Sequence, residues 1–308
     1  MTPSDAPGPA CEAPRFLTID EVVRTRPNPE ATRSRLKLHG LWVVGSIEAL
    51  ATSTVAIVGS RAPSEAGRRL AERIAREVAA AGVCVVSGLA LGIDGSAHAG
   101  ALEAGGATIG VLGGGHRQFF PPRNAALAAR MAASGGGVIS PYPPDAVARP
   151  FQFLQRNAVV AALVDAVLVV EAATRSGALS TASWASDFSV PVLAVPGDVD
   201  RAKAAGCNAL IRDGATLVRD ADDVLAALGV ERVPDAPRAA SKATRIVDAL
   251  PYARDLLLAL TDEPRDVETL AAVVDAPIGV LLGTLLRLEL LGAIVRDGPL
   301  YALTDRPG

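Results

Sequence analysis

Lysine is almost absent from this sequence of 308 residues. Only Lys37, Lys203 and Lys242 occur, so nearly all of the positive charge is carried by arginine. The planar guanidinium of arginine suits bidentate contacts to phosphate better than an ammonium group does. The formal net charge is −3, whereas proteins that bind duplex DNA without sequence preference are usually basic. If this protein binds nucleic acid, we expect it to do so through a local groove.

Aromatic residues and cysteines are also scarce. Aromatics make up 4% of a chain that is 50% hydrophobic, so the core is expected to be aliphatic. The cysteines, Cys11, Cys84 and Cys207, are odd in number and widely spaced, which excludes a disulfide framework and fits a reducing compartment. The first residues lack the features of a signal peptide, and no apolar run reaches membrane-spanning length. We therefore expect a cytoplasmic protein without a membrane partner.

Short apolar runs alternate with helical segments through the middle of the chain. The runs are residues 55–59, 84–88, 108–114, 136–140, 166–172 and 191–197. They are too continuous for half-exposed strands and are typical of parallel strands covered on both faces. The predicted helices between them are 64–81, 94–105, 123–134, 155–164 and 178–188. This alternation predicts an α/β fold with a doubly wound, mostly parallel Rossmann-like sheet.

The flanking segments predict further parts. A helical pattern near residues 19–26 and a possible strand at 41–44 precede the regular region, and the first residues are expected to be partly disordered. The expected divisions are an N-terminal extension (1–50), a Rossmann-like DNA-binding domain (51–230), a linker (231–243) and a small C-terminal domain (244–308).

The C-terminal domain is expected to be a winged helix. Three helical segments, residues 253–260, 266–274 and 277–291, precede an Asp297-Gly298 pair between two short apolar runs, which is a strong hairpin signal. The third segment holds only Arg287 and Glu289 as charged residues. A helix that reads the major groove needs several polar side chains, so we expect this domain to be a protein-contacting or scaffold module rather than a reader of duplex DNA.

The sequence offers little for catalysis or cofactor binding. The first predicted strand leads into GSRAPSEAG instead of the dinucleotide fingerprint, no P-loop occurs, and no residue cluster has metal-ligand spacing. Asp94 and His98 stand four residues apart on a predicted helix and would suit a base and its orienting partner. We favour structural roles, in which Asp94 caps the helix and His98 packs against a neighbouring strand. We expect neither a cofactor nor an enzyme.

Glu171 ends an apolar run in LVVEAATRSGALST, residues 168–181. It would serve either as a general base or as the carboxylate that holds Arg175 or Arg61 in place across a cleft. These residues alone leave both roles open.

Polar and glycine residues follow the ends of several predicted strands. Ligands in doubly wound sheets bind at the carboxyl ends of the strands, so these residues are expected to meet in one cleft. Arg61 follows the Gly59-Ser60 pair, Ser64 is a good N-cap, and Ser176-Gly177 begins a predicted helix, whose free N–H groups favour an anion. Together with Arg156-Asn157 they predict a site for phosphate groups.

In their order, these motifs resemble the DNA-processing protein A (DprA/Smf) family. The matching segments are AIVGSR (56–61), VVSGLALGIDGSAHAGAL (85–102), TIGVLGGG (108–115), PPRNAAL (121–127), GGVISPYPP (136–144), RN (156–157), VVEAATRSGALSTA (169–182), VPGDVD (195–200) and GCNALIRDGA (206–215). The resemblance implies a Rossmann-like core, typically homodimeric, that binds single-stranded DNA. It also implies that the protein protects incoming strands during natural transformation in competent cells and helps to load the RecA recombinase, with no catalytic step.

Carried over by motif, the resemblance implies which residues bind the strand. The expected DNA-binding residues are Gly59, Ser60, Arg61, Ser87, Gly88, Arg156, Asn157, Arg175, Ser176 and Gly177. The chain departs from the family pattern where Phe120 replaces the usual tyrosine before proline and where Ala158 replaces an arginine. Aromatic rings supply stacking energy in such grooves. We expect no more than two of the available rings to contact bases; the candidates are Phe119, Phe120, Tyr142, Phe151 and Phe153.

An enzyme is the alternative interpretation. In this interpretation the protein resembles the phosphoribohydrolases that activate cytokinins. The cluster in residues 168–181 would then bind one nucleotide, and Glu171 would attack or polarise its glycosidic bond. Those enzymes usually carry a P-G-G-x-G-T segment, whereas this chain has TRSGALST with a single glycine. The predicted winged helix also suits a protein that handles DNA. We therefore favour strand binding over nucleotide hydrolysis.

Overall fold

A computed structural model describes residues 13–231, 250–260, 263–290 and 292–303. The chain divides into two compact units, residues 1–233 and 234–308, and each is described by itself.

The first unit is built on a nine-stranded sheet with the order β1-β2-β6-β5-β4-β3-β7-β8-β9. All pairings from β6 through to β9 are parallel. The parallel strands are β3 (Thr54–Val58), β4 (Cys84–Ser87), β5 (Thr108–Val111), β6 (Gly137–Ser140), β7 (Ala166–Val169), β8 (Val192–Ala194) and β9 (Thr216–Leu217). The predicted doubly wound, mostly parallel α/β fold is confirmed, because each of the six predicted runs overlaps one of these strands.

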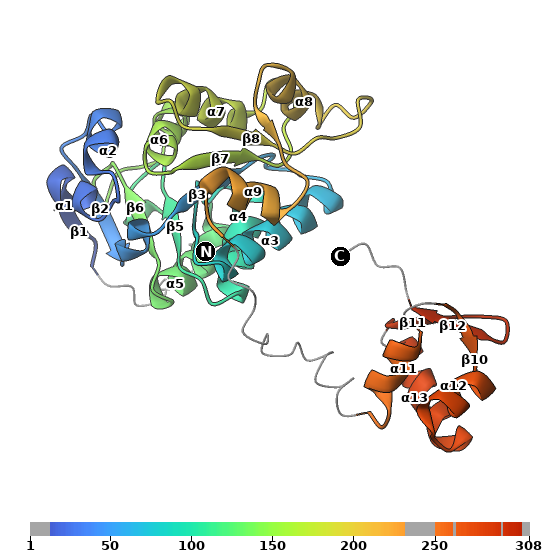
Figure 1. The fold of residues 1–308 in the computed structure, drawn as a ribbon. Coiled ribbons are helices and arrows are strands. Elements are labelled where there is room, and N and C mark those ends of the chain that lie inside the picture. Colours follow the sequence, from blue (N-terminus) through green and yellow to red (C-terminus); the bar gives the residue numbers. More distant parts are fainter. Residues whose placement is uncertain (1–12, 232–249, 261–262, 291, 304–308) are drawn as a thin grey trace, which may run out of the picture. The chain divides into compact units, whose positions relative to one another are not determined.

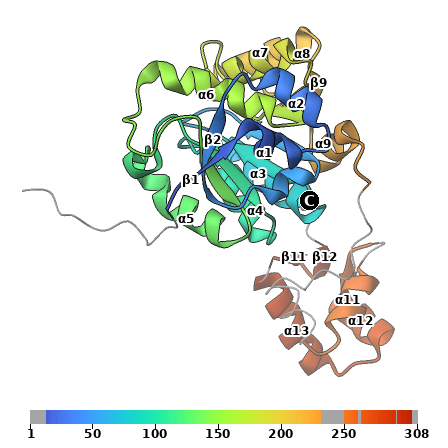
Figure 2. The same ribbon diagram turned by 90° about the vertical axis from the view of Figure 1, so that its left-hand side faces the viewer.

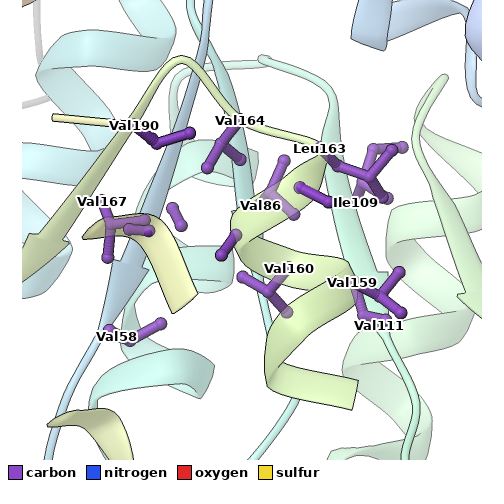
Figure 3. Packing of buried hydrophobic residues seen from close by; sticks show 14 of the residues in the cluster. Val58, Val86, Ile109, Val111, Val159, Val160, Leu163, Val164, Val167 and Val190 are labelled. Atoms are coloured by element: carbon purple, nitrogen blue, oxygen red, sulfur yellow. The ribbon is translucent and has the colours of Figure 1, made fainter. Parts of the chain in front are cut away.

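Helices cover both faces of the sheet, which explains why β3 to β7 are buried along their whole length (Figure 1). One hydrophobic layer joins the sheet to α3 (Glu65–Ala80), α4 (Ile93–Glu103) and α9 (Ala221–Leu228). The other layer contains α6 (Pro150–Ala162), α7 (Gly177–Asp187) and α8 (Ala205–Arg212). In that layer Val159 and Val160 of α6, and Leu163 just after it, pack in one cluster with Val86 and Ile109 of the strands (Figure 3). A further helix, α5 (Ala125–Ala133), contacts α4.

The order of the strands reverses between β3 and β7. From β3 the chain proceeds through β4 and β5 to β6 on one side, and from β7 it proceeds through β8 to β9 on the other. The loop after β3 leads to α3 on one face, while the loop after β7 leads to α7 on the opposite face. Diverging loops at such a switch point leave a crevice where ligands bind in this class of fold.

The described part of the expected N-terminal extension belongs to the sheet. β1 (Arg15–Thr18) and β2 (Gly40–Gly45) form an antiparallel pair, and β2 continues the sheet by antiparallel pairing with β6. Between them lie α1 (Ile19–Arg24) and α2 (Pro29–Arg35), beside β2 in Figure 2. The predicted helix near 19–26 and strand near 41–44 correspond to α1 and β2. Of the residues predicted to be disordered, 1 to about 15, residues 1–12 lie outside the described residues, and Arg15 begins β1.

The second unit has its own small core. Its elements are α11 (Ala253–Ala259), β10 (Arg265–Asp266), α12 (Val267–Val274), α13 (Ile278–Leu290), β11 (Ile294–Asp297) and β12 (Leu300–Leu303). The strands form a sheet in the order β10-β12-β11. The predicted hairpin lies at the expected position, with Gly298 at a φ of 60°. The winged-helix assignment stays a prediction, and most of the predicted linker lies outside the described residues.

Membrane-spanning character is weak throughout the described ranges. No single helix in them combines the length and the hydropathy of a membrane span, although α12 and α13 together, bent by 111°, pass on length and composition.

Candidate nucleic-acid interface

A cleft of about 810 Å³ opens at the switch point between β3 and β7. Nine of the ten residues predicted to bind DNA line it. They are Gly59, Ser60, Arg61, Gly88, Arg156, Asn157, Arg175, Ser176 and Gly177. The tenth, Ser87, is fully buried, and its hydroxyl donates to the Ile57 carbonyl at 2.7 Å. Ser87 therefore links β4 to β3 and is not among the residues that line the cleft, so its contact with DNA stays a prediction.

The loop after β3 is held close to the loop after β7. The Ser60 N–H donates to the Glu171 carbonyl at 2.7 Å, and the Ser60 hydroxyl accepts from the Ala62 N–H at 3.2 Å. Position 59 requires glycine, because a Cβ there would lie 2.7 Å from Ile93 Cγ1. This fixed backbone presents the exposed Arg61 side chain to the cleft.

The N-terminus of α7 faces the same cleft. Ser176 caps this helix, and its hydroxyl accepts from the Ala178 N–H at 3.3 Å. A Cβ at Gly177 would meet nothing within 4 Å, so the first turn is open on that side. The Asn157 side-chain amide donates to the Gly177 carbonyl at 3.2 Å and ties α6 to α7. Unpaired N–H groups at a helix start carry partial positive charge and attract anions.

Arg61 and Arg175 supply free positive charge beside this helix start. Both side chains are exposed and line the cleft. Within the described residues, no carboxylate forms an ion pair with either guanidinium. Two arginines without a carboxylate partner, beside the helix start at Gly177, suit the phosphates of an extended strand.

Arg156 is buried in the wall of the cleft that it lines, so its contact with DNA stays a prediction. Its guanidinium donates to the carbonyl oxygens of Gly88 and Val111. Burial lowers its pKa to about 10, and the nearby Asp94 charge opposes that shift. A Cβ at Gly88 would lie 2.6 Å from the guanidinium, so glycine is required there. Arg156 therefore supports the cleft wall and adds positive charge, with Nη1 engaged by backbone carbonyls and Nε by the Asn157 side chain.

Asp94 and His98 have separate hydrogen-bond partners. The cap of α4 is Gly92, and Asp94 accepts instead from the N–H groups of Gly88 and Ala90 at 3.1 and 3.3 Å. The prediction that Asp94 caps the helix is therefore wrong, and burial raises the pKa of this carboxyl. His98 is fully buried with Nδ1 2.8 Å from the Thr108 hydroxyl of β5, so its predicted packing against a strand is confirmed.

The Glu171 carboxylate is engaged with Ser64 and does not hold either of the two arginines considered from the sequence. It accepts from the Ser64 N–H at 3.0 and 3.1 Å and from the Ser64 hydroxyl at 2.5 Å. Ser64 in turn is the N-cap of α3, as predicted. The Glu171 carboxylate is therefore engaged at the start of α3. It lines a separate cavity of about 350 Å³ instead of the cleft, and it pairs with neither Arg61 nor Arg175.

Two of the candidate aromatic residues line the cleft. Phe120 and Phe153 have ring centroids 5.9 Å apart, and Phe120 is 53% exposed. The Arg61 and Arg156 guanidinium carbons lie 5.5 and 5.9 Å from the Phe153 centroid. The others do not line the cleft: the Tyr142 hydroxyl donates to Gln155 at 2.8 Å, Phe119 packs in a small hydrophobic cluster with α5, and Phe151 is 52% exposed.

Sequence reasoning missed that Phe153, Arg156 and Asn157 share one helix face. The predicted helix began at residue 155, whereas α6 begins at Pro150. The signal was present, because residues three and four apart on a helix are neighbours. Pro150 at the first position, a common place for proline in helices, marks the true start.

The comparisons with known proteins agree with this architecture. A family model described as "DNA recombination-mediator protein A" matches residues 32–229. The Escherichia coli protein Smf is 39% identical over 82% of this chain and 68% of its own length. A putative DNA processing protein DprA from Mycobacterium tuberculosis is 42% identical, and the match spans 64% of this chain but only 52% of that relative.

Two solved structures have the same fold as the first unit. DNA processing protein A from Streptococcus pneumoniae superposes with a TM-score of 0.59 at 37% identity, covering 63% of this chain and 69% of that one. The Helicobacter pylori protein, described for its single-stranded DNA binding mode, gives 0.60 at 28% identity, covering 70% and 95%. This chain therefore belongs to the DNA recombination-mediator protein A family.

Proposed function

We propose that the protein binds single-stranded DNA in the cleft at the β3–β7 switch point, without a catalytic step. The observation that carries this proposal is the placement of Arg61 and Arg175, both free of carboxylate partners among the described residues, beside the capped start of α7. Such an arrangement positions phosphates without reading the base sequence. The Phe120 and Phe153 rings add a surface on which bases stack.

The shape of the site favours a single strand over a duplex. The basic groups lie in a recessed cleft at the end of the sheet, and the chain as a whole carries a net charge of −3. A duplex binder needs a broad basic surface or a polar helix that enters a groove. A single strand is flexible, so its backbone and bases can enter a recessed site.

The polar groups that would suit catalysis are engaged in structure. Glu171 is bonded to Ser64, Asp94 to the backbone of the Gly88–Ala90 loop, and His98 is fully buried against Thr108. A general base must reach the proton that it removes. These contacts support binding over hydrolysis, and no observation favours the phosphoribohydrolase alternative.

Membership of the family supports a wider role in natural transformation and recombination. In this proposal the protein acts in the cytoplasm as a homodimer, protects incoming strands and assists the loading of RecA onto them. The second unit supports contact with a protein partner, because α13 exposes Leu282, Leu286 and Leu290. A stimulation of RecA-dependent ATP hydrolysis on protein-coated single strands would measure this activity.

Fluorescence anisotropy of a labelled single-stranded oligonucleotide across a salt series tests the proposal. Arg61→Ala and Arg175→Ala should each weaken binding about tenfold and reduce the logarithmic salt slope by about 0.7, the value for one lost phosphate contact. Arg212→Ala is the matched control, because Arg212 is exposed, pairs with Asp213 and lines neither the cleft nor the other cavities. Binding of a mononucleotide in the absence of strand binding would contradict the proposal.

A further inference from the structure

A second cavity of about 300 Å³ adjoins the cleft. Its lining residues are Arg117, Gln118, Phe119, Phe120, Val147 and Ala148. Phe120 is the residue that lines both this cavity and the main cleft. Its ring therefore stands between the two spaces, with one side toward Phe153 at a centroid distance of 5.9 Å.

The walls of this second cavity are held together by backbone hydrogen bonds. The Gly115 N–H donates to the Ala146 carbonyl at 2.7 Å, and the Arg117 N–H donates to the Pro144 carbonyl at 2.9 Å. These bonds join the turn after β5 to the loop after β6, and both loops follow parallel strands of the sheet. The cavity is thus formed before any ligand arrives, which lowers the entropy cost of binding.

The chemistry of the lining suits one nucleotide. Phe120 and Val147, exposed by 53% and 65%, provide apolar surfaces for the face of a base. Gln118 offers an amide that can donate to and accept from a base edge. Arg117 provides a cation. One of its nitrogens contacts Asp145 at 2.9 Å, and because a guanidinium has five N–H donors, others remain for a phosphate.

We propose that this cavity is a second nucleotide subsite for the strand that occupies the main cleft. This inference rests on the proposed function. The strand passes over Phe120, so that one base lies on the Phe153 side and the following base lies on the Val147 side. Arg117 contacts the phosphate that belongs to the second nucleotide.

The negative charge of Asp145 should repel the phosphate of the second nucleotide. Its carboxylate is 70% exposed and lies beside the path assigned to the phosphate. Exposed ion pairs contribute little to stability, so a phosphate can share Arg117 without loss of fold. Removing the charge of Asp145 should therefore strengthen strand binding, whereas removing Arg117 should weaken it.

The test compares oligonucleotides of roughly 3 to 12 nucleotides by anisotropy, using the full chain. With the shortest strand that binds, Arg117→Ala and Asp145→Asn should equal the wild type, because that strand fills only the main cleft. With longer strands Arg117→Ala should bind about tenfold more weakly, and Asp145→Asn about threefold more tightly. The controls Arg212→Ala and Asp213→Asn, taken from an exposed ion pair on α8, should follow the wild type at every length.

The outcomes separate this inference from the proposed function. Equal affinity of the Arg117 and Asp145 variants and the wild type at all lengths overturns the second subsite, while loss of binding by Arg61→Ala at all lengths still supports the main cleft. Absence of strand binding at every length overturns both. Urea denaturation of each variant checks that the fold is retained.

Discussion

Glu171 and Ser64, 107 positions apart in the sequence, share a hydrogen bond of 2.5 Å. Glu171 follows β7 and Ser64 caps α3, so this contact joins the loops that follow the two strands at the switch point. Gly67 lies against it, because a Cβ there would approach Glu171 Oε2 to 2.8 Å. Glu171, which the sequence marks as a candidate catalyst, thus holds together the two loops that border the cleft.

The variant Glu171→Gln should therefore lose stability rather than catalysis. The amide keeps the shape but loses the charge that strengthens the hydrogen bonds from Ser64, so the free energy of unfolding should fall by about 1–3 kcal/mol. Urea denaturation measures this change. Glu48→Gln is the control, because Glu48 is exposed and has no ion pair among the described residues. An unchanged stability together with loss of nucleotide hydrolysis would restore the enzyme interpretation.

Arg156 and Arg61 should separate stability from binding. Arg156→Ala removes a buried cation and leaves the carbonyls of Gly88 and Val111 without their donor, so the free energy of unfolding should fall by about 2–3 kcal/mol. Arg61→Ala alters an exposed side chain, so stability should change by less than about 0.5 kcal/mol while strand affinity falls. Urea denaturation of both variants measures the free energy of unfolding, and fluorescence anisotropy measures their affinity for the strand. Equal stability of the two variants would show that the contacts of Arg156 are unimportant.

The sequence predicted the parallel strands well because their burial on both faces leaves uninterrupted apolar runs. It did not predict β9 or β1, because both residues of β9 are exposed and β1 is an edge strand with Phe16 46% exposed. Such strands form because they pair with a neighbouring strand, and the hydrophobic periodicity of the sequence does not reveal this pairing. The meeting of the strand ends in one cleft was predictable from the doubly wound topology alone.

Individual side chains at the site were harder to assign from sequence. Arg61 and Arg156 both line the cleft, yet the side chain of Arg61 is exposed and Arg156 is only 4% exposed. The difference arises because Gly88 and Val111, far away in sequence, place carbonyls within reach of Arg156. Ser87 shows the same limit, since its hydroxyl is satisfied by the adjacent strand.

Phe153 should contribute to strand binding in two ways. Its ring lines the cleft and lies 5.5 Å from the Arg61 guanidinium carbon, so it can stack a base and hold Arg61. Phe153→Leu keeps an apolar side chain but removes the ring, and loss of stacking should weaken binding about tenfold, at the lower end of 1–3 kcal/mol per base. Phe16→Leu is the control, because Phe16 packs on Trp42 and lines no described cavity. Equal anisotropy curves for the two variants would contradict a stacking role.

His98 should make the fold sensitive to mild acid. Thr108 donates its hydroxyl to the Val85 carbonyl at 2.6 Å, so it accepts from His98 Nδ1, and the ring is neutral with Nε2 unprotonated. Burial lowers the pKa of His98 to about 3, whereas an unfolded histidine titrates near 6.5.

The unfolded chain therefore binds a proton between these two pKa values and the folded chain does not, so stability falls as the pH decreases through this window. From about pH 7.5 to about pH 5 the loss from one such histidine is on the order of 2 kcal/mol. His116, whose pKa burial also lowers, acts in the same direction, and Asp94, whose pKa burial raises, acts in the opposite one. His98→Gln cannot titrate, so urea denaturation at several pH values should show a pH dependence weaker by that amount, although the variant is less stable at neutral pH. Parallel curves for the variant and the wild type would mean that the buried ring takes up its proton as readily in the folded chain as in the unfolded one.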